Sequence, residues 1–168
     1  MRTGRDIGIV SIGLLAAVML LFGCPAWLHG DGWKVALLHH FFHANAFHLA
    51  VNCFSLYALC KGRGVTPAML FLAFICATLS WFCSSADPVG ASNIIFALLG
   101  LYTPAFSHSW WRHPNTIIFF ITNMAMAFLP QVSAVTHLVS FGLGCVFAVV
   151  IRKVNSLVHD YRRAAYNR

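Results

Sequence analysis

Residues 90–100 read Gly-Ala-Ser-Asn-Ile-Ile-Phe-Ala-Leu-Leu-Gly, and they place one serine at the start of an apolar helix. Gly90 allows a sharp backbone turn, and Ser92 stands where a helix N-cap or first-turn residue is expected. Its hydroxyl would therefore lie beside free backbone N–H groups at the positive end of the helix dipole. Such donors suit an oxyanion, although a serine that only caps the helix explains the same position.

The predicted helix is short for a membrane. From Ser92 to Thr103, before Pro104, it rises roughly 18 Å, whereas the hydrocarbon core of a bilayer is about 30 Å thick. Such a helix must start inside the membrane or be buried among longer neighbours. Irregular backbone at that depth is tolerated only where protein or a water-filled cavity surrounds it. We therefore expect a wet pocket below the membrane surface, with Ser92 on its floor.

The composition is that of an integral membrane protein. The 168 residues are 60% hydrophobic and 9% charged, with a mean hydropathy of +0.76. A single polytopic domain over residues 1–168 is the simplest organisation. The first apolar stretch is followed by several others, so we do not interpret it as a cleaved signal peptide.

The acidic residues exclude several kinds of intramembrane chemistry. The chain has no glutamate, and none of its aspartates, Asp6, Asp31, Asp87 and Asp160, lies within an apolar span. A paired-aspartate protease and an H-E-x-x-H zinc site therefore lack their carboxylates. A proton-coupled transporter with a buried carboxylate relay is disfavoured for the same reason. No C-x-x-C pair occurs, so we interpret the cysteines as apolar filler.

The basic residues predict the topology. The net charge of +7 is spread along the chain rather than gathered into a nucleic-acid-binding patch. By the positive-inside rule both termini are cytoplasmic, and only Lys34 among the Lys and Arg residues faces outward. Both termini inside requires an even number of spans. We expect six, at residues 7–23, 44–60, 67–83, 92–104, 116–129 and 133–151, with a structured segment at the outer interface over 24–42.

This orientation brings polar residues to one depth. Spans two, four and six all enter the bilayer from the outer side. Their first turns carry most of the polar residues found inside the spans, namely His43, His48 and Asn52, then Ser92, then His137. A serine hydroxyl is a poor nucleophile without a base, and no carboxylate is available. The candidate bases are therefore His137, His48 and His43.

Two helix faces would bring Ser92 and His137 together. His137, Ser140 and Gly144 share one face of the sixth span, and Ser92, Phe96 and Gly100 share one face of the fourth. Small residues let helices approach closely, and the Phe96 ring would then lie one turn below the imidazole. A histidine hydrogen-bonded inside a helix bundle is the alternative for His137.

Two other polar groups have open interpretations. His48 and Asn52 lie at i and i+4, where both could donate to a carbonyl oxygen as it becomes negative, or could simply join helices by hydrogen bonds. His39 and His43 have helical spacing but no third ligand, so we predict no metal and no cofactor.

Three motifs resemble the rhomboid intramembrane serine proteases. His43-Ala-Asn-Ala-Phe-His48-Leu-Ala-Val-Asn52 is similar to the family's H-x-x-x-x-H-x-x-x-N, and Gly90-Ala-Ser92-Asn93 is similar to its G-x-S-x. His137 followed by Gly144 resembles its H-x-x-G-x-x-x-G helix. The likeness extends from about Trp33 to Val150, with the motifs in the family's order.

The resemblance implies specific roles. It implies Ser92 as nucleophile and His137 as general base, with an oxyanion hole formed by His48, Asn52 and the Ser92 backbone N–H. His43 would brace the outer loop. Family substrates are single-span membrane proteins, cut near or within the bilayer. The implied fold is an all-α bundle of six transmembrane helices with a short fourth helix and a site open to the outside. Apart from the resemblance, the compact size without extra soluble domains suggests a bacterial inner membrane.

The chain departs from the family pattern at several positions. Asn93 and Ser140 stand where the family often has glycine, Phe96 replaces a tyrosine, and Trp33-Lys34 only partly matches a Trp-Arg pair. A catalytically inactive rhomboid-like protein that binds transmembrane helices is therefore the alternative function. Such proteins typically lack the serine or the histidine, and this chain has both.

Overall fold

The computed structural model describes residues 2–23, 32–63, 65–83, 89–103 and 133–166, with the single positions 117, 121 and 125. Every regular element in these ranges is helical, as the all-α prediction requires. The elements are α1 (Arg2–Phe22), α2 (Trp33–Leu38), the 3₁₀ turn η2 (His39–Phe41), α3 (Ala46–Arg63), α4 (Pro67–Trp81), α5 (Ser92–Tyr102) and α8 (Ala134–Tyr166). The predicted fifth span, 116–129, lies almost entirely outside the described residues.

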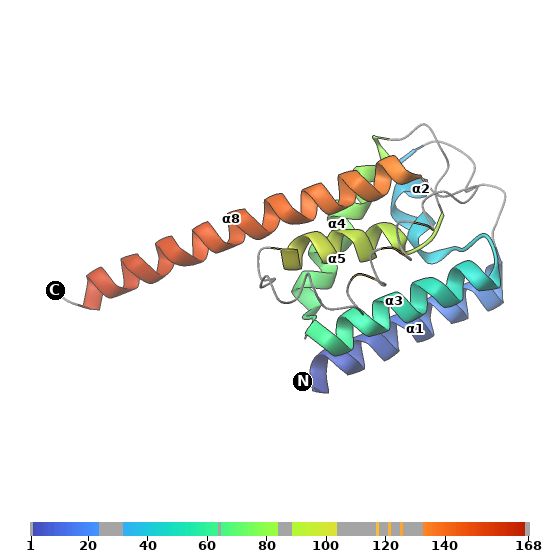
Figure 1. Ribbon diagram of the computed structural model, residues 1–168, viewed down its shortest axis with the longest axis horizontal. Coiled ribbons are helices and arrows are strands. Elements are labelled where there is room, and N and C mark those ends of the chain that lie inside the picture. Colours follow the sequence, from blue (N-terminus) through green and yellow to red (C-terminus); the bar gives the residue numbers. More distant parts are fainter. Residues whose placement is uncertain are drawn as a thin grey trace.

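The helices surround α5 (Figure 1). Helix α8 runs alongside α5 and then projects beyond the other helices, so the C-terminus lies far from the bundle. Helices α1 and α3 lie antiparallel and side by side. They meet closely because Gly8 has no side chain, and a Cβ there would lie 2.9 Å from Cys60 Cβ.

Polar residues start three of the helices. Asn45 precedes α3, and its Oδ1 accepts the His48 backbone N–H at 2.8 Å. Thr66 caps α4 by accepting the Met69 N–H at 3.2 Å, with Pro67 in the first helical turn. Ser133 accepts the Thr136 N–H at 3.3 Å and so begins α8. Each side chain satisfies a backbone donor that the helix cannot satisfy itself.

Helix α5 forms the centre of the core. All of its residues from Asn93 to Tyr102 are buried, and it packs most extensively on α8. The contact depends on two glycines: a Cβ on Gly100 would lie 2.1 Å from the Phe141 carbonyl oxygen, and one on Gly144 would lie 2.3 Å from that of Ala97. Only glycine at both positions allows the two backbones to touch in this way.

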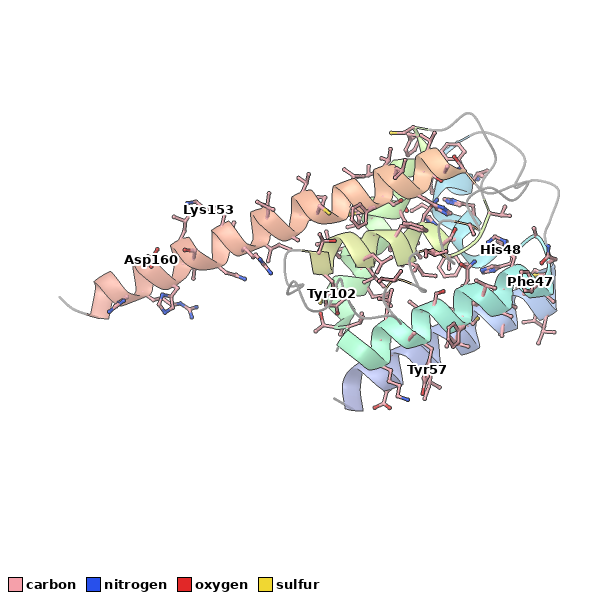
Figure 2. The ribbon with its side chains drawn as sticks, in the orientation of Figure 1. Phe47, His48, Tyr57, Tyr102, Lys153 and Asp160 are labelled. Carbon is pink, nitrogen blue, oxygen red and sulfur yellow. The ribbon has the colours of Figure 1, made fainter. Side chains whose placement is uncertain are left out.

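Helix α8 is longer than the sixth span predicted at 133–151, since it continues to Tyr166. No glycine or proline follows Gly144, so no residue interrupts the helix there. The side chains from Ile151 to Asp160 are all exposed. Figure 2 shows Lys153 and Asp160 on this projecting half.

The number of membrane crossings stays a prediction. In the described part, one stretch, Ala134–Asp160, is long and apolar enough to cross a bilayer. Three further apolar helices, Asp6–Phe22, Pro67–Trp81 and Ser92–Tyr102, are shorter. The single-domain organisation predicted for residues 1–168 is likewise untested.

Candidate active site

Ser92 and His137 are in direct contact. The distance from Ser92 Oγ to His137 Nε2 is 2.8 Å, a hydrogen bond between residues 45 positions apart. Ser92 is the first residue of α5, and Ala91 occupies the N-cap position with no side-chain capping bond. The hydroxyl is thus directed to an imidazole, in the position where a nucleophile would transfer its proton.

The imidazole of His137 lies flat on a phenyl ring. The centroids of Phe96 and His137 are 4.4 Å apart, and the ring planes differ by 12°. His137 is 2% exposed, and its Nδ1 has no hydrogen-bond partner among the described residues. Stacking and burial therefore fix the orientation of this ring, and no carboxylate of the described residues bonds to it.

Two donors converge on the other side of Ser92, at Gly90. A Cβ on Gly90 would lie 2.9 Å from His48 Nε2 and 3.1 Å from Asn52 Nδ2. Gly90 has a positive φ of 116°, which a glycine adopts without strain. Both side chains are buried, and Asn52 Nδ2 has no partner among the described residues. Asn52 Nδ2 is thus an unpaired donor close to Gly90, two residues before Ser92.

Figure 2 shows that two neighbouring side chains of α3 point in different directions. His48 lies near the N-terminal end of α3, close to α2, and is buried, whereas the adjacent Phe47 points outward and is exposed. The helical period therefore directs the polar face of α3, with His48 and Asn52 at i and i+4, toward the start of α5.

The backbone that leads into Ser92 is held by the segment before α3. The His39 carbonyl oxygen accepts the Gly90 N–H at 3.0 Å. His43 Nε2 accepts the Ala91 N–H at 3.4 Å. His43 therefore contacts the turn that carries Ser92, whereas the resemblance implied a role in the outer loop.

Sequence reasoning gave no role to the imidazole of His40. Its Nε2 lies 3.3 Å from Thr78 Oγ1 of α4, and its ring centroid is 3.7 Å from that of His39. Both side chains are completely buried. The signal in the sequence was the density of histidines before α3, which was considered as a metal site and set aside for want of a third ligand.

Burial keeps these histidines neutral. The segment between α1 and α3 lies outside the predicted spans, and burial lowers the pKa of His39 to about 4 and that of His43 to about 3. The neighbouring His48 lowers the pKa of His43 further. Burial also lowers the pKa of His40. A neutral His43 can accept the Ala91 N–H, which a protonated one cannot.

Ser140 bonds to a different helix from the one that the shared face suggested. Its hydroxyl donates to Ser80 Oγ of α4 at 2.7 Å, and Ser80 donates to the Ala77 carbonyl oxygen at 2.7 Å. On α8, Gly144 is the small residue that allows the close approach to α5. Asn93 is buried, and its Oδ1 has no partner among the described residues.

The family model of the Rhomboid domain matches residues 29–154, well over half of the chain. This chain belongs to the rhomboid family. Comparisons with curated proteins and with solved structures find no match. Rhomboids are membrane-embedded and generally serine proteases, and the match contains every residue of the site described above.

The described part of this rhomboid offers no metal centre, since no three His, Cys, Asp or Glu side chains gather there in a suitable arrangement. His39 and His43, the pair that the sequence singled out, bond instead to backbone groups.

Proposed function

We propose that this rhomboid is an intramembrane serine endopeptidase with a Ser92–His137 dyad. The observation that carries the proposal is the 2.8 Å contact between Ser92 Oγ and His137 Nε2. It supports the proposal because a serine needs an adjacent base, and the ring nitrogen Nε2 of His137 faces the hydroxyl.

The reaction would proceed in two halves. Ser92 Oγ attacks the peptide carbonyl while His137 Nε2 takes the hydroxyl proton, and the same nitrogen then gives that proton to the departing amine. The acyl-enzyme is hydrolysed when His137 takes a proton from water and the hydroxide attacks the ester. Oγ leaves with that proton, which restores the free serine.

His48, Asn52 and the Ser92 backbone N–H would stabilise the negative oxygen of each tetrahedral intermediate. The convergence of His48 Nε2 and Asn52 Nδ2 on Gly90 supports this assignment. Donors oriented before the substrate arrives need no rearrangement, so a dyad without a third acidic residue would suffice.

The substrates would be single-span membrane proteins, cleaved where the helix unwinds near the outer surface. The short α5 supports this substrate class, because it starts below the level that a full-length span would reach. The enzyme would span the membrane several times, with its site open to the outside.

Labelling in isolated membranes with a fluorescent fluorophosphonate tests the dyad. We expect the wild-type protein to be labelled, and Ser92→Ala and His137→Ala each to lose at least 99% of the signal. Ser156→Ala and His159→Ala remove the same groups from exposed positions on α8 and should label like the wild type. A folded wild type that does not label would favour a non-catalytic rhomboid that binds transmembrane helices.

Asn52→Ala tests the oxyanion donors separately from folding. Because Asn52 Nδ2 has no partner among the described residues, its loss leaves no buried group stranded there. We expect labelling to slow by about 100-fold, with the midpoint of thermal unfolding in detergent unchanged. A large drop in that midpoint would instead make Asn52 a link between helices.

A further inference from the structure

A large apolar cavity separates α1 from α4. Its volume is about 710 Å³. One wall is a single face of α1 that includes Ile7, Val10 and Leu14, and the opposite wall includes Phe71 and Phe74 of α4. Helix α1 is held against α3 through Gly8 and Cys60, which leaves its other face turned toward this space.

The cavity opens sideways, toward the region that lipid would occupy. Val10 and Phe71 both line it, and they are 71% and 66% exposed. Among the described residues that line it, two have polar side chains, Asp6 and Ser11. Ordered water needs two to four polar partners, so water is a poor occupant of most of this space.

The shape of the cavity favours a thin, flexible occupant. The lining of α1 from Asp6 to Leu15 rises about 14 Å. A hydrocarbon chain is narrow and flexible, so it can enter through the opening and fill the space.

Asp6 is the charged group among the described lining residues, and it indicates which headgroup belongs to that chain. Asp6 is exposed and stands at the start of the apolar part of α1, where the predicted topology places the headgroups. A carboxylate attracts an ammonium group and forms charge-assisted hydrogen bonds with its N–H donors. Ethanolamine headgroups carry such donors, choline headgroups do not, and glycerol headgroups leave the lipid anionic.

We propose that this cavity is a binding site for phosphatidylethanolamine, with one acyl chain between α1 and α4 and the ammonium group on Asp6. The lining also includes Ala91 and Ile94, the residues on either side of Ser92 and Asn93. The acyl chain would therefore reach the start of α5. The site exists independently of the proposed protease activity.

Native mass spectrometry tests the site. The protein is reconstituted into vesicles of equal parts phosphatidylethanolamine, phosphatidylcholine and phosphatidylglycerol, extracted in mild detergent and analysed for retained lipid. We expect one phosphatidylethanolamine per wild-type chain, at least tenfold above either other lipid. Ser92→Ala should retain the same amount, which separates this result from the dyad proposal.

Two variants with matched controls make the test specific. Val10→Trp fills the cavity and should lose the lipid, whereas Leu21→Trp, on an exposed part of α1 outside the lining, should keep it. Asp6→Asn should still bind lipid but lose the preference for ethanolamine, whereas Asp160→Asn should not.

Three results would overturn the proposal. They are equal retention by Val10→Trp and Leu21→Trp, no headgroup preference in the wild type, and a preference for phosphatidylglycerol. The last would assign the lipid contact to a basic group instead of Asp6.

Discussion

Gly90 combines two properties at one residue of the site. Its φ of 116° is unfavourable for other residues, and the space where a Cβ would stand is bordered by His48 and Asn52. Strained backbone and a steric clash act differently, because strain costs stability whereas the clash displaces His48 and Asn52, the donors that we propose for the oxyanion. A second glycine in the chain separates these effects.

Gly90→Ala should remove labelling by the fluorophosphonate almost completely. The new methyl group would lie 2.7 Å from His48 Cε1, so the imidazole must move. We expect the labelling rate to fall at least about 100-fold. Gly32→Ala is the control, because Gly32 has a φ of 122° but open space around it. Equal effects of the two substitutions would show that strain alone is responsible.

The buried histidines should make stability depend on pH. The pKa of His39 is lowered to about 4 and that of His43 to about 3, whereas an unfolded histidine titrates near 6.5. Between these values the unfolded chain binds more protons than the folded one. Stability is therefore complete above about pH 6.5 and decreases as the pH falls toward 4.

Thermal unfolding in detergent between pH 7.5 and 5 measures this dependence. We expect the midpoint to fall on acidification, and His43→Gln to reduce the slope because one buried titrating group is gone. His159→Gln, at an exposed position, should leave the slope unchanged. A midpoint that stays constant or rises as the pH falls would contradict this explanation.

At the scale of elements, the catalytic geometry depends on how closely α5 and α8 approach. Ser92 begins α5 and His137 lies in the first turn of α8, and the two helices are in backbone contact further along, at Gly100 and Gly144. A methyl group at either glycine must push the helices apart. The distance between Ser92 Oγ and His137 Nε2 should then increase.

Gly144→Ala should reduce stability and labelling together. Its Cβ would lie 2.3 Å from the Ala97 carbonyl oxygen, and such overpacking typically costs about 1–3 kcal/mol. Gly142→Ala, on the same helix with open space around it, should be neutral or slightly stabilising. Chemical denaturation and fluorophosphonate labelling measure the two effects. Unchanged labelling in Gly144→Ala would mean that the dyad does not depend on this contact.

At the scale of the whole molecule, the placement of charge predicts the orientation in the membrane. The projecting half of α8 carries exposed basic residues, Arg152, Lys153, Arg162 and Arg163. Positive charge is retained on the cytoplasmic side, so this half should stand in the cytoplasm. Cys83, at the far end of α4, should then face the outside.

A membrane-impermeant maleimide tests this orientation in a Cys24→Ser background. Cys83 is exposed and unpaired, so intact cells should be labelled there. A second variant carries Cys24→Ser, Cys83→Ser and Ser156→Cys. Its new cysteine should be labelled only after the cells are permeabilised. Labelling of Ser156→Cys in intact cells would reverse the predicted topology.

Much of the architecture could be predicted from the sequence because hydropathy and helix signals are local. The helical class followed from the apolar stretches, and the helix that starts at Ser92 ends within two residues of the predicted 104. The continuation of α8 past residue 151 was missed, because a switch from apolar to basic residues marks a membrane boundary but does not end a helix.

The sequence by itself determined that this protein is helical, that it belongs in a membrane, and that its polar residues stand at the starts of three helices. It left three histidines as candidate partners for Ser92. In the tertiary structure, Ser92 contacts His137, His43 accepts the Ala91 N–H, and Ser140 donates to Ser80. The physical reason is that these distances depend on how the backbones of α5 and α8 pack at Gly100 and Gly144, which no local pattern specifies.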